Sequence, residues 1–124
     1  MANSDNVLRA GLTPKHIDVA ELVACTGFTP IPFERLLLAP SKLDQCDSYE
    51  IPVSDFNFNI FHCPHQEEVI TSGAEILMAI DADLTLVSQK GEHLTLTKGQ
   101  SVFIPAYIGH YELSSNGRVA RAFN

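Results

Sequence analysis

The chain has 124 residues, of which 45% are hydrophobic and 19% are charged, and its 15 acidic and 8 basic residues give a formal net charge of −7. This length predicts one domain, and this composition is typical of a folded protein. The negative charge argues against nucleic acids and membranes as partners, because both attract clustered lysine and arginine.

The sequence also favours a cytoplasmic protein. No apolar run approaches the roughly 20 residues that span a bilayer, and residues 1–5 lack the basic and apolar segments of a signal peptide. The cysteines Cys25, Cys46 and Cys63 are widely spaced and odd in number. We therefore expect reduced thiols.

Residues 1–30 predict an arm that contains one short strand and one short helix. The strand is expected over residues 6–12. Asp18 is the expected N-cap of a helix over residues 19–25, with Glu21 as its capping-box partner. Gly27 is expected to end this helix in the left-handed conformation.

Residues 31–124 predict a mainly β domain, of the jelly-roll or barrel kind. The prolines between residues 30 and 40 indicate an extended connector with one strand at residues 35–38. Beyond it, short apolar strands alternate with turn signals about every ten residues. We expect strands at 49–53, 56–61, 68–71, 75–80, 84–88, 93–97, 101–104, 110–114 and 119–123.

Two hairpins can be predicted in detail. In the first, a three-residue loop ends at Gly91, which sets Leu86 opposite Leu94 and Leu84 opposite Leu96. The second turns at Asn116-Gly117, the preferred pair of a type I′ turn. Its predicted strand partners are Tyr111 with Ala122 and Leu113 with Ala120.

The spacing of Gly99, Pro105 and His110 resembles the second motif of the cupin superfamily, although Tyr107 replaces the motif's middle glycine. In that motif the histidine points into the barrel. The first motif would place a glutamate at Glu75 and histidines near residues 68–71, where this sequence has none. Because a metal needs three or four donors, we expect His110 to be a partly buried histidine bonded to a neighbouring strand.

Other reaction sites are also disfavoured. In the segment His62-Cys63-Pro64-His65, proline breaks the strand and adjacent side chains point to opposite faces, so we do not expect zinc there. The sequence has no Gly-x-Ser-x-Gly elbow and no glycine-rich phosphate loop. One enzymatic hypothesis is an independent small cupin enzyme with a metal near His110 and Glu75. The absence of the first motif's histidines weakens this hypothesis.

Residues 4–23, which begin Ser-Asp-Asn-Val-Leu-Arg-Ala-Gly-Leu-Thr-Pro-Lys, resemble a signature of type I mannose-6-phosphate isomerases. The remainder is similar to the C-terminal cupin region of the bacterial enzymes. The resemblance implies that the full enzyme interconverts mannose 6-phosphate and fructose 6-phosphate. It also implies catalytic roles for Arg9 and Lys15, because a phosphate and a developing enediolate need fixed positive charges.

In that family, zinc is held by a glutamine, two histidines and a glutamate that lie upstream of the position matching Met1. The resemblance therefore implies no zinc in this chain, no turnover by the chain alone, and sugar-phosphate binding only in the full-length context. A truncated natural product, a fragment and a mis-assigned start are all consistent with the sequence. The alternative hypothesis is a stand-alone binding or assembly module, which could form a homodimer through its exposed barrel face.

Overall fold

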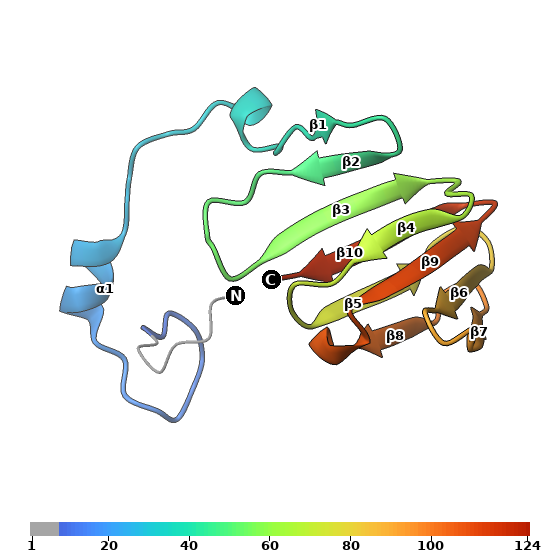
Figure 1. The fold of residues 1–124 in the computed structure, drawn as a ribbon. Helices are drawn as coiled ribbons and strands as arrows, with labels where there is room; N and C mark the ends of the chain where they lie inside the picture. Colours follow the sequence, from blue (N-terminus) through green and yellow to red (C-terminus); the bar gives the residue numbers. More distant parts are fainter. Residues whose placement is uncertain (1–7) are drawn as a thin grey trace. The chain divides into compact units, whose positions relative to one another are not determined.

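The computed structural model describes residues 8–124, which divide between two units with the boundary after Leu36. The first unit carries the helix α1 (Val19–Cys25) and the 3₁₀ turn η1 (Phe33–Arg35), and the second carries all the strands (Figure 1). Among the described residues, no helix has the length and apolar character that crossing a bilayer requires.

The predicted helix is confirmed, but its predicted end is wrong. The Asp18 carboxylate accepts a hydrogen bond from the Glu21 N–H (3.0 Å), as expected of an N-cap. At the other end, the Thr26 hydroxyl donates to the Leu22 carbonyl oxygen (2.6 Å), and the Thr26 N–H donates to Val23. Gly27 is not left-handed, because Thr26 already satisfies these carbonyls from an extended conformation.

Two predicted strands, one in the arm and one in the connector that follows it, are absent from the described residues. Residues 8–12 of the strand expected at 6–12 are not extended in a sheet, and residues 6–7 lie outside the described part of the chain. The strand expected at 35–38 is replaced by η1, in which the Arg35 N–H donates to the Pro32 carbonyl oxygen (2.9 Å). The proline fixes the backbone just before this turn and favours it over a strand.

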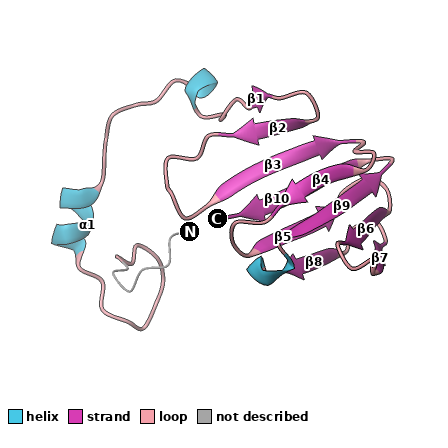
Figure 2. Ribbon diagram, in the orientation of Figure 1, coloured by secondary structure: helices cyan, strands magenta, loops and turns pink. Residues whose placement is uncertain are grey.

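The second unit is a pair of antiparallel sheets, and the predicted mainly β, cupin-type fold is confirmed (Figure 2). The larger sheet has the order β1-β2-β3-β10-β5-β8, and the smaller has the order β4-β9-β6-β7. Their bounds are β1 Ser41–Lys42, β2 Cys46–Tyr49, β3 Asn57–His62, β4 Glu67–Ile70, β5 Glu75–Ala79, β6 Leu84–Ser88, β7 His93–Leu96, β8 Ser101–Ile104, β9 His110–Ser115 and β10 Arg118–Phe123.

Alternating side chains of both sheets point between them and form one core. The burial pattern of β5 alternates strictly, and β9 shows the same period of two. The core side chains are Cys46, Phe61, Val69, Leu77, Ala79, Leu84, Leu86, Leu96, Ile104, Tyr111, Leu113 and Val119. Polar side chains at these inward positions therefore stand out, and they mark the site described below.

Eight of the nine strands predicted beyond residue 48 lie within about one residue of the observed ones. The exception is the strand expected at 49–53, because the chain pairs earlier, over β2. The short strand β1 was not predicted. The Leu43 N–H donates to the Cys46 carbonyl oxygen (2.8 Å), which closes the tight turn between β1 and β2. Pro52, which lacks an N–H, would interrupt a strand at 49–53.

The first predicted hairpin is confirmed in its register. Leu84 pairs with Leu96 and Leu86 with Leu94, as the alternation of apolar residues predicts. The Ser88 N–H donates to the Glu92 carbonyl oxygen (2.9 Å), so the loop has the predicted three residues. Gly91 has φ of 76°, which supplies the left-handed position that such a loop needs.

The second predicted hairpin is wrong, because β9 and β10 belong to different sheets. β9 pairs with β4 and β6, whereas β10 pairs with β3 and β5. Residues 116–117 cross between the sheets, and Gly117 is not left-handed. A Cβ atom at Gly117 would lie 2.7 Å from the Ala82 backbone nitrogen, so glycine is needed here for close approach.

An exposed ion pair between Arg118 and Asp81 stabilises the chain where it crosses from β9 to β10. Arg118 donates two side-chain hydrogen bonds to the Asp81 carboxylate (2.6 and 3.0 Å), and its backbone N–H adds a third (3.2 Å). These hydrogen bonds lower the pKa of Asp81 from 3.8 to about 2. A carboxylate whose folded-state pKa is depressed stabilises the fold above its unfolded pKa, and this stabilisation disappears as the pH falls through the folded-state value.

We therefore expect Asp81→Asn to lower the free energy of unfolding at pH 6, and the difference from the parent protein to shrink between pH 4 and pH 2. Urea titrations at stepped pH values measure this difference. Asp44→Asn is the control, because Asp44 is exposed and the structure describes no ion pair for it within residues 8–124. A pH-independent difference for Asp81→Asn would contradict the expectation.

Candidate functional site

Glu75 is a carboxylate inside the barrel. It begins β5 and is 1% exposed, and it shares the inward face of this strand with the fully buried Leu77 and Ala79. Charged side chains are almost never buried to this degree unless they are paired. Glu75 is therefore the natural starting point for a site.

Two side chains from different strands hold the Glu75 carboxylate. Arg121 of β10, the strand next to β5, donates from Nε to Oε2 (2.9 Å) and from Nη2 to Oε1. Tyr111 of β9 reaches across from the smaller sheet, and its hydroxyl donates to Oε2 (2.8 Å). The three residues form the Glu75–Arg121–Tyr111 triad, which joins the two sheets through charge-assisted hydrogen bonds.

The charge of the Glu75 carboxylate is balanced within the triad itself. Burial and the neighbouring Glu75 charge raise the pKa of Tyr111, so its hydroxyl stays protonated and remains a donor. The Arg121 guanidinium neutralises the carboxylate and also stacks on the Phe123 ring, 4.0 Å from its centroid. Both carboxylate oxygens are thus engaged, and they offer little capacity for another ligand.

His110, the histidine of the second cupin motif, does not point into the barrel. Buried Tyr111 takes the inward position, and His110 lies on the opposite face of β9, near Glu68 of the neighbouring strand β4 (Nε2 to Oε2, 3.8 Å). Its partial burial and its strand neighbour agree with the prediction, whereas the orientation that the motif implies is wrong. The turn before it uses the 3₁₀ segment η2 (Ala106–Ile108) and a left-handed Gly109, in place of the motif's glycine at position 107.

The segment from His62 to His65 does not gather ligands either. The His62 Nε2 atom lies 3.0 Å from the Asp47 carboxylate, on the outer face of the larger sheet. Cys63 instead donates its S–H to the Asn116 carbonyl oxygen (3.4 Å). The other cysteine of the second unit, Cys46, is buried, and burial raises the pKa of its thiol, which makes it unreactive.

The barrel residues do not fit a zinc ion. Zinc needs three or four nitrogen, oxygen or sulfur donors around one centre, and no group of three His, Cys, Asp or Glu side chains within residues 8–124 could provide them. Glu75 and His110, the two motif residues, lie on different sides of their sheets. The geometry therefore contradicts the hypothesis of an independent cupin enzyme with a metal near these two residues.

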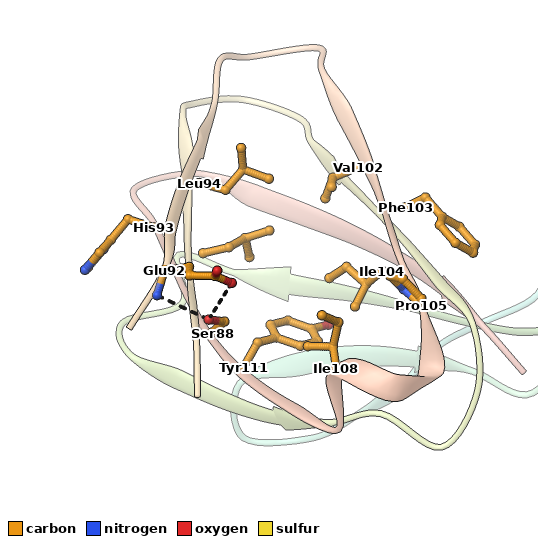
Figure 3. Close-up of a pocket in the computed structure, with 11 residues that line it drawn as sticks. Ser88, Glu92, His93, Leu94, Val102, Phe103, Ile104, Pro105, Ile108 and Tyr111 are labelled. Carbon is orange, nitrogen blue, oxygen red and sulfur yellow. Dashed lines mark hydrogen bonds between the residues drawn. The ribbon is translucent and has the colours of Figure 1, made fainter. Parts of the chain in front are cut away.

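A small apolar cavity of about 180 Å³ opens between β6, β7 and β8 (Figure 3). Ser88 and Glu92 are among its polar lining residues, and the Ser88 hydroxyl donates a hydrogen bond to the Glu92 carboxylate (3.4 Å). The other lining residues are Leu86, His93, Leu94, Val102, Phe103, Ile104, Pro105, Ile108 and Tyr111. An apolar wall with a carboxylate at its rim and no lysine or arginine would repel a phosphate, so this cavity does not suit a sugar phosphate.

Arg9 and Lys15 lie in the first unit, away from the strands in sequence. Arg9 is partly buried and Lys15 is exposed, and Lys15 donates its backbone N–H to the Thr13 hydroxyl (3.2 Å). The structure describes no ion pair for either side chain within residues 8–124. Their predicted roles in a sugar-phosphate site therefore stay predictions.

Sequence reasoning missed Arg121 and Tyr111 as partners of Glu75. A signal for Arg121 was present, because it alternates with Val119 and Phe123 on the face of β10 that the apolar pattern assigns to the core. A charged residue at such a position predicts a buried partner of opposite charge. Tyr111 could be found in the same way only if the register of β9 were already known.

Comparison with known proteins places this geometry in a family. The model of the mannose-6-phosphate isomerase cupin domain matches residues 45–124. Mannose-6-phosphate isomerases from Salmonella typhimurium and Escherichia coli are each 44% identical to the chain over its whole length, which corresponds to 32% of their own length. The chain thus spans about a third of these relatives.

Solved structures agree with the sequence comparison. The crystal structure of mannose 6-phosphate isomerase from Salmonella typhimurium, bound to its substrate and to zinc, has a TM-score of 0.84 to this chain at 42% identity. The match covers 100% of this chain and 32% of that one. The apo form of the same protein gives the same TM-score, identity and coverage.

Proposed function

The chain belongs to the mannose-6-phosphate isomerase family as its cupin domain, and from this premise we propose that it is the C-terminal structural domain of an enzyme that interconverts mannose 6-phosphate and fructose 6-phosphate. The observation that carries this role is the triad, in which Arg121 and Tyr111 occupy the carboxylate of Glu75. Because these two side chains engage the buried carboxylate, it stabilises the fold and is not free to take part in a reaction.

In this proposal the zinc ligands come from the part of the enzyme that this chain does not match. Zinc, when bound there, polarises the sugar oxygens. The solved relative with substrate and zinc supports such a location, because that structure is about three times as long as the matched region. The barrel residues of this chain contribute packing and hold no metal.

Arg9 and Lys15 are the residues that we propose to serve the reaction directly. Isomerisation moves a proton between carbons 1 and 2 of the sugar, and negative charge develops on the enediolate oxygens. The Arg9 guanidinium would stabilise that charge, and the Lys15 ammonium would bind the phosphate. Exposure of Lys15 and partial exposure of Arg9 leave both side chains accessible to a substrate.

We place the protein in the cytoplasm. Cys25 and Cys63 are exposed free thiols and Cys46 is a buried one. Exposed free thiols are typical of proteins that work in a reducing compartment. The sugar phosphates of the proposed reaction are likewise metabolites of the cell interior.

The isolated chain is expected to show no isomerase turnover with either sugar phosphate and to retain less than one zinc per chain after desalting. A coupled assay and elemental analysis measure these two quantities. The Escherichia coli relative, prepared in parallel, is the positive control. Turnover in a metal-checked preparation, or one tightly held zinc per chain, would overturn the proposal that the barrel is purely structural.

A further inference from the structure

The outer faces of the two sheets differ in chemical character. In the smaller sheet, most outward positions are polar, among them Glu68, Glu112, Thr85 and Thr95, and they alternate with the buried core residues. Ile70 and Val87 are the apolar exceptions on that face. This alternation is normal for a sheet with one side in water. The outward positions of the larger sheet do not follow it.

An unbroken apolar row crosses five adjacent strands of the larger sheet. In register, it consists of Tyr49, Phe58, Ala122, Ile76 and Phe103, which we call the apolar row. The Tyr49 and Phe58 rings contact each other, with centroids 5.6 Å apart. Five strands span roughly 20 Å, because neighbouring strands lie about 4.8 Å apart. The apolar row is therefore wide enough for a domain interface.

The apolar row is most exposed at the β5–β8 end. Phe103 is 62% exposed and Ile76 is 50% exposed, and Met78 in the next row is 43% exposed, whereas Tyr49, Phe58 and Ala122 are half-buried. A contiguous apolar surface of this kind marks an interaction site in a folded protein. The short side chain of Ala122 lies at its centre, where it lets a partner approach the sheet closely.

A hollow of about 270 Å³ lies at the same place. Ile76, Phe103 and Ala122 of the apolar row line it together with Phe56, and Asp55 and Asn124 are among the polar residues around it. Interfaces are most stable where an apolar side chain of one partner fills a pocket of the other. The hollow is thus a receptor for an apolar side chain of whatever covers the sheet.

We infer that the apolar row docks onto the portion of a mannose-6-phosphate isomerase that this chain does not match, whether that portion is joined to the chain or is a separate polypeptide. The inference rests on the proposed function and names the surface that the function requires. The curated relatives supply the occupant, because the chain spans 32% of their length. A second copy is disfavoured, since both copies would carry the same net charge of −7.

The test combines this chain with the unmatched two thirds of the Escherichia coli relative, co-expressed as separate polypeptides with a tag on the latter. We expect the chain to co-purify in a one-to-one complex. Ile76→Lys is expected to weaken binding at least tenfold, because the interface would have to bury an ammonium group. Phe103→Lys, at the end of the apolar row, is a second variant with the same expected effect.

Ile70→Lys is the matched control. Ile70 is 77% exposed on β4 of the smaller sheet, so the same substitution there is expected to leave binding within twofold of the parent. Urea midpoints equal to that of the parent would verify that each variant folds. Failure of the parent chain to bind, equal binding by Ile76→Lys, or a homodimer that Ile76→Lys dissolves would each overturn the inference.

Isomerase turnover in the assembled pair separates this inference from the proposed function. Binding that depends on Ile76, without turnover, would contradict the catalytic proposal and leave the docking surface standing. Turnover that Ile76→Lys leaves unchanged would contradict the docking surface and leave the catalytic proposal standing. Both results can be read from the same preparations.

Discussion

Replacement of Arg121 by methionine is expected to reduce the free energy of unfolding by about 3–5 kcal/mol at pH 7, because it leaves a buried carboxylate without its counter-charge. Glu75 is 1% exposed, so water cannot replace the lost guanidinium. The hydrogen bond from Tyr111 remains, but one neutral donor does not compensate a full charge in the core. Urea unfolding followed by circular dichroism measures the change.

Two companion variants separate charge from shape. Tyr111→Phe removes one hydrogen bond to the carboxylate and is expected to cost about 1.5–3 kcal/mol, less than the loss of Arg121. The double variant Arg121→Met/Glu75→Met removes both charges and is expected to recover most of the stability lost in Arg121→Met, because an apolar pair of similar volume fills the site. A cost of under about 1 kcal/mol for Arg121→Met, or no recovery in the double variant, would show that the triad is not a stabilising unit.

The triad also explains how a cupin-type barrel can keep a motif glutamate without a metal. In the sequence, Glu75 stands where the first cupin motif has its glutamate, and the histidines of that motif are missing. The structure shows the carboxylate bound by a guanidinium and a phenol that come from strands of both sheets. Positive charge from a side chain thus performs the neutralisation that a metal ion would otherwise perform.

The parts of the fold that the sequence predicts well depend on local signals. The hairpin of β6 and β7 is an example, because the leucine alternation and a left-handed Gly91 lie within about a dozen residues of each other. The Asn116-Gly117 pair gave an equally strong local signal and was misleading. A turn signal shows that the chain reverses, and only contacts distant in sequence decide whether the two strands then pair or enter opposite sheets.

In the candidate site, too, local signals were predictive and contacts between distant residues were not predicted. Motif spacing identified Glu75, but its partners Tyr111 and Arg121 lie 36 and 46 residues further along the chain. For His110 the motif predicted the strand correctly but implied that the side chain points into the barrel, whereas it lies on the outer face of β9. A shift of one residue in a strand moves a side chain to the other side of the sheet, and here Gly109 and the preceding 3₁₀ turn set the phase that puts Tyr111 inside.

Truncation of Leu113 to alanine is expected to cost about 2–5 kcal/mol, because the side chain is wholly buried and the core around it cannot collapse freely. Leu113 lies on β9, an inner strand of the smaller sheet, and pairs with Glu67 on one side and Leu86 on the other. Both neighbours hold the backbone in place, so the space left by the leucine stays open.

Leu94→Ala makes the same chemical change on the edge strand β7, where the side chain is 45% exposed, and is expected to cost less than about 1 kcal/mol. Urea midpoints of the two variants at pH 7 give the comparison directly. Similar losses for the two substitutions would mean that β9 is not at the centre of the core. A large loss for Leu113→Ala alone would instead show that the interior of the barrel is stabilised by close packing as well as by the triad.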